Sequence, residues 1–231
     1  MDHKFYKEEL LIGKSNIEKL KSKHIALFGI GGVGSFVAEA LVRAGVGKLT
    51  LIDFDKIEIS NINRQIHANT ETIGLFKTDV MFKRIKKINP NIDIEKINLK
   101  YNEKNHKKIF NKAWDYIIDA IDMVSSKLLL IEKAKENNID IISSMGTANK
   151  IKPSLFKITD IYNTKMCPLA RVMRKELRKR NIENVKVLYS DEKPKNFSGN
   201  LKNKGTLSFV PSSAGLMIAG EVIRDIIDYE S

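Results

Sequence analysis

The chain has 231 residues, of which 42% are hydrophobic, and its 40 lysines and arginines outnumber 28 acidic residues, which gives a net charge of +12. This length suffices for one large domain with a substantial core, and no apolar run is long enough to span a bilayer. The first residues lack the apolar middle of a signal peptide, so we expect a cytoplasmic protein without membrane contact. The single cysteine, Cys167, excludes an intrachain disulfide and a four-cysteine zinc site, and we expect no zinc. The positive charge indicates an anionic partner such as nucleic acid, or only a lysine-rich surface.

Apolar spacing predicts one or two short helices over 8–21, followed by strands alternating with helices. Strands are expected at 24–29, 48–53, 92–97, 114–118 and 139–143. Helices are expected at 33–44, 76–88, 103–111 and 124–136. Strands that are apolar almost throughout and alternate with helices are typical of a parallel sheet covered on both faces. The sequence therefore predicts an α/β protein with a Rossmann-like, mostly parallel sheet.

The pattern changes beyond residue 151. We expect a strand in "SLFKITDI", a helix over 168–180, a strand in "NVKVLY", a mobile polar loop over 190–205, and a strand in "GTLSFV". A closing helix should follow, with Pro211 in its first turn. We interpret 1–231 as a single domain, in which a nucleotide-binding half (1–150) is followed by a smaller strand-rich C-terminal extension of the same sheet (151–231).

A glycine-rich turn between the first strand and the next helix is the first functional signal. It contains Gly29, Gly31, Gly32 and Gly34. Glycine has no Cβ, so a phosphate or ribose can approach the helix N-terminus closely. Asp53 ends the following strand, where a carboxylate can accept hydrogen bonds from ribose hydroxyls. The pattern indicates a nucleotide site, but it fits a nicotinamide cofactor as well as ATP.

Charged residues farther along the chain favour a triphosphate. Arg64 and Lys77 follow Asp53, and their cationic groups are suited to neutralising phosphates and the charge that develops during attack at phosphorus. Asp122, in "YIIDAIDMVSSKLLL", is suited to holding Mg2+ together with phosphate oxygens, or to capping the next helix. We take Arg64, Lys77 and Asp122 as catalytic candidates and regard a nicotinamide dehydrogenase as disfavoured.

Basic residues recur on one face of the expected helix 168–180. They are Arg171, Arg174, Lys175 and Arg178. Apolar residues occupy the other face, which we expect to be buried: Leu169, Val172, Met173 and Leu177. The basic stripe suits RNA phosphates, although a solvated charged face would have the same sequence pattern.

The motifs "GIGGVGS", "DFDKIEISNINRQ", "GLFKTDVM" and "DAIDMVSSK" resemble those of the superfamily of ThiF, MoeB and the ubiquitin-activating enzymes. Members use ATP to adenylate a carboxylate. Within this superfamily, "NRQIHA", "CPLARVMRKELRKR" and "GTLSFVPSSAGLMIAGEVIRD" resemble the tRNA threonylcarbamoyladenosine dehydratases. The chain departs from that pattern at Cys167, where an acidic residue is usual, and at "SSMGTANKIKPS", which is usually richer in glycine.

The resemblance implies that ATP and Mg2+ activate the carboxylate of threonylcarbamoyladenosine in tRNA, and that ring closure then releases AMP. It implies that Gly32 approaches the nucleotide and that Asp53 binds ribose, with Asp55 assisting or capping a turn. The implied phosphate and metal contacts are Ser60, Asn61, Asn63, Arg64, Lys77 and Asp122, where Asn61 and Asn63 shape a turn and reach phosphate or a neighbouring subunit.

A homodimer and a cysteine desulfurase partner are further implications of the resemblance. We expect Cys167 to be a partly buried bystander and His67 to be structural. One alternative is an adenylyltransferase that activates the C-terminus of a small ubiquitin-like sulfur carrier. Another is a nucleotide-sensing module without catalysis.

Overall fold

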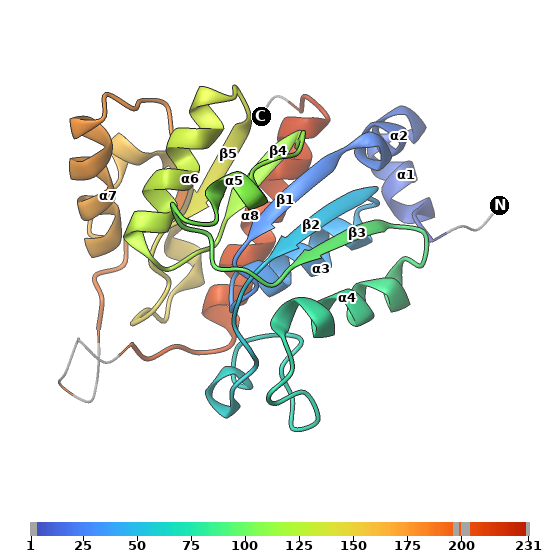
Figure 1. Cartoon of the computed structure of the whole chain (residues 1–231), viewed down its shortest axis with the longest axis horizontal. Helices are drawn as coiled ribbons and strands as arrows, with labels where there is room; N and C mark the ends of the chain where they lie inside the picture. Colours follow the sequence, from blue (N-terminus) through green and yellow to red (C-terminus); the bar gives the residue numbers. More distant parts are fainter. Residues whose placement is uncertain (1–3, 196–198, 200–203, 230–231) are drawn as a thin grey trace.

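The computed structural model describes residues 4–195, 199 and 204–229. Within these residues, seven strands form one sheet in the order β3-β2-β1-β4-β5-β7-β6 (Figure 1). The first five strands in chain order are β1 (His24–Phe28), β2 (Lys48–Ile52), β3 (Asp93–Ile97), β4 (Tyr116–Asp119) and β5 (Asp140–Ser144). All neighbouring pairs among them are parallel. The predicted Rossmann-like α/β fold is confirmed.

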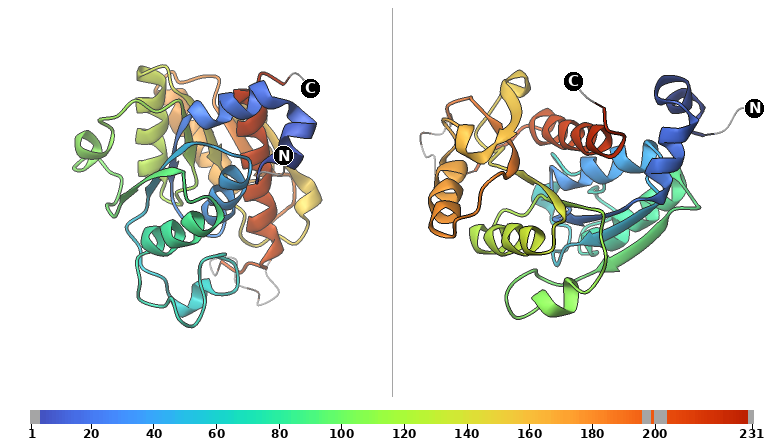
Figure 2. Two further views of the ribbon diagram at one scale, coloured as in Figure 1. Left: turned by 90° about the vertical axis from the view of Figure 1, so that its right-hand side faces the viewer. Right: turned by 90° about the horizontal axis from the view of Figure 1, so that it is seen from above.

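Helices cover both faces of the sheet (Figure 2). One face packs against α2 (Lys14–Ser22), α3 (Gly34–Arg43), α4 (Lys77–Ile88) and α8 (Phe209–Ile226), and α1 (Tyr6–Ile12) precedes α2. The other face packs against α5 (His106–Ile109), α6 (Val124–Glu136) and α7 (Pro168–Lys179). One or two short helices were expected over 8–21 and two are present, whereas the helix expected at 103–111 is shorter than predicted.

The strand order places a topological switch between β1 and β4. The chain leaves β1 for β2 on one side of the sheet and later returns to β4 on the other, and Leu27 pairs with Leu51 and with Ile118. Ligands of open parallel sheets bind at such a point, beyond the carboxyl ends of the strands. This edge carries the glycine turn after β1, Asp53 after β2 and Asp122 after β4.

The C-terminal extension continues the sheet with two strands. β7 (Lys186–Ser190) pairs parallel to β5, and β6 (Phe156–Asp160) pairs antiparallel to β7 at the edge. The strand predicted in "GTLSFV" is wrong, because Phe209 and Val210 open α8 and Val210 is fully buried in the helix-covered core. The extension is therefore not rich in strands. Part of the loop expected to be mobile, residues 196–198 and 200–203, lies outside the described residues.

Close backbone packing joins α8 to α3 beside the glycine turn. A Cβ at Gly215 would lie 2.5 Å from the carbonyl oxygen of Val33, so only glycine permits this approach. Pro211 is the third residue of α8, where its missing N–H costs no helical hydrogen bond, and the prediction of its position is confirmed. Among the described residues, no helix has the length and apolarity needed to cross a membrane.

Candidate active site

A cavity of about 1040 Å³ opens at the carboxyl ends of β1, β2 and β4. Its walls come from the glycine turn, the segment after β2, the segment after β5 and the first turns of α4 and α7. Nine of the twelve predicted nucleotide-binding positions line it: Gly29, Gly31, Gly32, Asp53, Asp55, Asn61, Arg64, Lys77 and Asp122. The structure thus brings these predicted residues together in one cavity.

The glycine turn needs its glycines for two different reasons. Gly29 has φ +90°, and a Cβ there would lie 2.6 Å from the carbonyl oxygen of Ala120. A Cβ on Gly34 would lie 1.8 Å from the carbonyl oxygen of Gly29, and Gly34 is not part of the cavity wall. Gly31 and Gly32 line the cavity directly. Gly29 and Gly34 therefore shape the turn, and Gly31 and Gly32 are open to a ligand.

Asp53 is held by backbone donors at the end of β2. Its carboxylate accepts the N–H of Ile30 at 2.6 Å and the N–H of Asp55 at 2.9 Å, and the residue is only 8% exposed. Burial raises the pKa of Asp53, and the positive charge of Lys77 opposes this rise. The carboxylate thus joins the glycine turn to the segment after β2 and faces the cavity.

Lys77 is a buried cation at the first position of α4. Its Nζ lies 2.7 Å from Oδ2 of Asp55, and its side chain is 8% exposed. A cation at a helix N-terminus is unfavourable unless an anion lies beside it, and Asp55 supplies that anion here. Asp55 is therefore the partner of Lys77, an interaction that the sequence analysis did not predict.

The segment that includes Ser60, Asn61, Asn63 and Arg64 folds over the glycine turn. Nη1 of Arg64 donates to the carbonyl oxygen of Ser60 at 2.6 Å and to Oδ1 of Asn63 at 3.0 Å. Asn61 is buried, and its Oδ1 accepts the N–H of Glu58 at 3.1 Å. The Cγ of Arg64 would lie 3.4 Å from a Cβ on Gly32, which places the arginine against the glycine turn. Ser60 and Asn63 do not line the cavity.

Gln65, the neighbour of Arg64, was not among the predicted site residues. It lines the cavity, it is 5% exposed, and its Oε1 has no hydrogen-bond partner among the described residues. A buried acceptor without a donor carries a desolvation cost, so a ligand donor or water is expected there. In the sequence, its position directly after Arg64 in "NINRQ" was the signal that could have identified it as a site residue.

Asp122 is exposed at the cavity, three residues beyond β4. The N-cap of α6 is Met123 and no side chain caps this helix, so the alternative in which Asp122 caps it is wrong. Among the described residues, no group of three or more His, Cys, Asp or Glu side chains is placed to hold a metal ion. A single carboxylate in the wall of a cavity that also contains Arg64 and Lys77 nonetheless fits Mg2+, which proteins often bind through one carboxylate and substrate phosphates.

A buried ion pair supports the loop that carries Asp122. Lys127 Nζ lies 2.8 Å from Oδ2 of Asp119 and 3.1 Å from Oγ of Ser143, and the side chains of Lys127 and Asp119 are both 0% exposed. Asp119 also accepts the N–H of Ile121 at 3.1 Å. This pair was not predicted from the sequence, although a lysine within the apolar run "SSKLLLI" was a signal for it.

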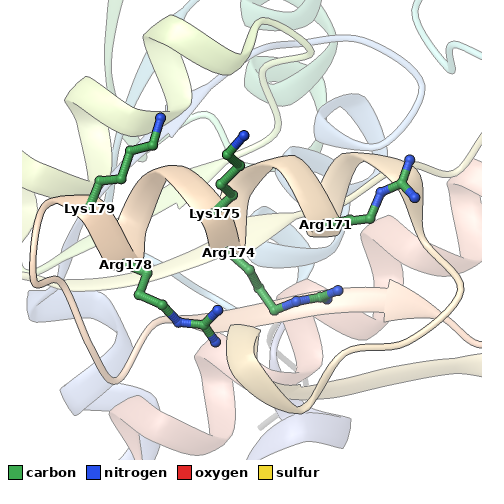
Figure 3. A pocket seen from close by; sticks show the side chains of 5 residues that line it. All are labelled: Arg171, Arg174, Lys175, Arg178 and Lys179. Carbon is green, nitrogen blue, oxygen red and sulfur yellow. The ribbon is translucent and has the colours of Figure 1, made fainter.

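The basic helix α7 carries its cations in two rows (Figure 3). Arg171, Lys175 and Lys179 form one row and Arg174 and Arg178 the other, and together they line a surface hollow of about 480 Å³. Both arginines of the second row contact other residues of the chain. Arg174 donates to the carbonyl oxygen of Thr164, and the guanidinium carbon of Arg178 lies 5.2 Å from the ring centre of Tyr162.

On the opposite face of α7, Met173 and Leu177 are buried and Leu169 is half-buried. Val172 is 42% exposed, so its predicted burial is wrong, because the helix meets the rest of the protein along a narrower strip than expected. Cys167 is buried at the N-cap of α7 and lines the cavity.

The chain belongs to the ThiF family, whose model matches residues 6–231. It is similar to the tRNA threonylcarbamoyladenosine dehydratase of Bacillus subtilis, at 41% identity over 98% of this chain and 96% of that protein. The crystal structure of E. coli tRNA N6-threonylcarbamoyladenosine dehydratase, TcdA, in complex with ATP superposes with a TM-score of 0.92 at 31% identity, over 97% of this chain and 94% of that one. A molybdopterin-synthase adenylyltransferase of Haemophilus influenzae is 32% identical over 60% of this chain and 57% of that protein. The resemblance seen in the sequence motifs is confirmed.

Proposed function

We propose that this protein is an ATP-dependent tRNA threonylcarbamoyladenosine dehydratase. The observation that carries the proposal is the buried Lys77, which lines the same cavity as Arg64 and the glycine turn at the switch point of the sheet. These cations match a polyphosphate, and the relatives that match along nearly the whole chain are named for this activity.

In the proposed reaction, the threonylcarbamoyl carboxylate attacks the α-phosphorus of ATP and expels pyrophosphate. A nitrogen of the same side chain then attacks the acyl-adenylate carbonyl, closes a ring and expels AMP, and its proton passes to an acceptor that we do not assign. The net change in the threonylcarbamoyl side chain is loss of water, while ATP is converted to AMP and pyrophosphate. Because ring closure is intramolecular, positioning supplies much of the acceleration and no enzyme nucleophile is needed.

In this reaction the chain's own residues would bind the nucleotide and neutralise the charge on its phosphates. Asp53 accepts from ribose hydroxyls, Gly31 and Gly32 admit the phosphates, and Arg64 and Lys77 compensate the charge that develops on them. Asp122 would hold Mg2+, which supplies further charge neutralisation when it is bound. Two further predicted positions, Ser60 and Asn63, act through the placement of Arg64.

The tRNA is proposed to lie along the basic row of α7. Arg171 and Lys175 are exposed and have no carboxylate partner among the described residues, so they are available to phosphates. Arg174 and Arg178 hold the surface in place and add positive charge. This assignment gives RNA a continuous path from α7 to the cavity, whose wall includes Arg171 and Arg174.

We also propose a homodimer in the cytoplasm, built as a single domain. Exposed apolar side chains on the segment between β2 and α4 support an interface: Ile59 is 75% exposed, Ile73 43% and Leu75 46%. A cysteine desulfurase partner rests on the sequence resemblance alone. Sedimentation of the purified protein tests the dimer.

The rival function is adenylation of the C-terminus of a small sulfur-carrier protein. It is less well supported, because the adenylyltransferase relative matches a smaller part of the chain than the dehydratases do. Pyrophosphate and AMP should be followed with threonylcarbamoylated tRNA, with unmodified tRNA and without RNA. Release stimulated only by the modified tRNA, with cyclic product detected by mass spectrometry, is the expected result. Equal release in all three reactions would overturn the proposal.

A further inference from the structure

Asn149 ties together two chain segments at the rim of the cavity. Its N–H donates to the carbonyl oxygen of Gly205, and its Oδ1 accepts the N–H of Gly205, both at 2.8 Å. Its carbonyl oxygen accepts the N–H of Lys195, again at 2.8 Å. Asn149, in the segment that follows β5, therefore contacts both the segment that follows β7 and the segment that precedes α8.

The backbone of Asn149 is built for this arrangement. Its φ is +59°, in the left-handed region where asparagine is among the better tolerated residues. The second of these segments is held from its other side as well, because Nδ2 of Asn63 donates to the carbonyl oxygen of Thr206 at 3.1 Å. The rim is thus anchored both to the wall after β5 and to the segment that carries Arg64.

The anchored segments present two lysines to the cavity. Lys193 and Lys204 line it, and both are exposed. Within the described residues, neither ammonium group has a carboxylate partner. Lys195 lies between them in the sequence and is exposed too, but it does not line the cavity. Position at the rim, rather than exposure alone, distinguishes Lys193 and Lys204.

We propose that Asn149 is a positioning residue that holds Lys193 and Lys204 at the mouth of the cavity, where they bind backbone phosphates of the RNA substrate. The inference rests on the proposed function and names a second RNA contact, apart from the face of α7. The nucleotide phosphates have their own cations in the buried Lys77 and half-buried Arg64. The two exposed lysines instead meet the polymer that enters from solvent, and each phosphate contact should release counterions.

The test compares Lys204→Ala and Lys193→Ala with Lys195→Ala, the matched control at an exposed neighbouring position that does not line the cavity. The affinity for threonylcarbamoylated tRNA is measured by fluorescence anisotropy over a salt series, and the KM for ATP is measured in parallel. We expect each rim variant to bind RNA several-fold more weakly, to lower the slope of log K against log salt by about 0.7–0.9, and to keep the KM for ATP. Lys195→Ala should match the wild type.

Asn149 is tested with two substitutions that separate side chain from backbone. Asn149→Gly accepts the positive φ but removes the acceptor for Gly205, so its RNA affinity should fall as in Lys204→Ala. Combining the two changes should add little, because they act through one contact. Asn149→Asp keeps an Oδ acceptor and tolerates this φ, so it should restore most of the affinity. Thermal unfolding midpoints verify that each variant is folded.

The inference is overturned if Lys204→Ala raises the KM for ATP and leaves RNA affinity unchanged, or if Lys195→Ala weakens RNA binding equally. Failure of the proposed function would look different. Lysine-dependent RNA binding without RNA-stimulated pyrophosphate release would support this contact and exclude the dehydratase. Stimulated release with unchanged RNA affinity in both rim variants would retain the dehydratase and exclude the contact.

Discussion

Replacing Lys127 with methionine should destabilise the protein and loosen the loop that carries Asp122. The Lys127 ammonium group is fully buried against Asp119, and methionine has a similar length but no charge. The substitution therefore leaves the carboxylate of Asp119 inside the core without its cationic partner. It tests whether this buried pair holds the wall of the cavity in place.

The expected loss in the free energy of unfolding depends on the hydrogen-bond donors that remain around Asp119. Removing one partner of a buried ion pair costs about 3–5 kcal/mol. Asp119 would keep the hydroxyl of Ser143, at 2.6 Å, and the N–H of Ile121, at 3.1 Å, as donors. The loss in the free energy of unfolding should thus lie at the lower end, about 3 kcal/mol. For a chain of this size, that corresponds to a fall in Tm of roughly 6–12 °C.

Urea unfolding monitored by circular dichroism measures the free energy, and calorimetry measures Tm. The double variant Lys127→Met with Asp119→Asn should recover part of the loss, because no charge then remains buried without a partner. Lys133→Met is the matched control on the same helix, where Lys133 pairs with Glu136 at the surface and the expected change is below about 1 kcal/mol. A loss below about 1 kcal/mol in Lys127→Met would refute the reasoning.

Three further changes probe the proposed phosphate site at Lys77 and two positions outside the cavity wall, His67 and Gly34. Lys77→Met should lower pyrophosphate release by about 100-fold or more, because it removes the buried cation from the proposed phosphate site. His67→Leu should remove a pH dependence of stability. Burial lowers the pKa of His67 from 6.5 to about 4, so below pH 6.5 the unfolded chain binds more protons than the folded chain. The free energy of unfolding of the wild type should therefore fall by up to about 3 kcal/mol as the pH drops from 6.5 to about 4. Gly34→Ala should cost about 1–3 kcal/mol or more, because its Cβ would lie 1.8 Å from the carbonyl oxygen of Gly29.

Each of these expectations has its own control. Lys83→Met, at an exposed position of the same helix, should keep full pyrophosphate release. The difference between the unfolding free energies of wild type and His67→Leu should change between pH 6.5 and 4, and a flat difference contradicts the assignment. Gly31→Ala meets open space and should unfold like the wild type, so equal destabilisation of both glycine variants would contradict the packing argument.

The sequence alone was sufficient for the α/β fold and for the main positions of the cavity. The strands and helices of the first half repeat as local periodic patterns, and each strand–helix unit returns the next parallel strand in the same direction. The carboxyl ends of parallel strands meet at one edge, so the glycine turn, Asp53 and Asp122 had to converge. Such convergence needs no knowledge of side-chain contacts.

Tertiary structure decided the features whose partners are distant in the sequence or compete with local preference. Residues 205–210 have strand-like composition, yet Val210 joins a core beside α3, and the energy gained by this burial overrides local propensity. Asn149 reaches Gly205, and Lys77 pairs with Asp55, because the fold brings their segments together. A buried charge or a rim contact depends on what surrounds it in space, and a linear pattern does not contain that information.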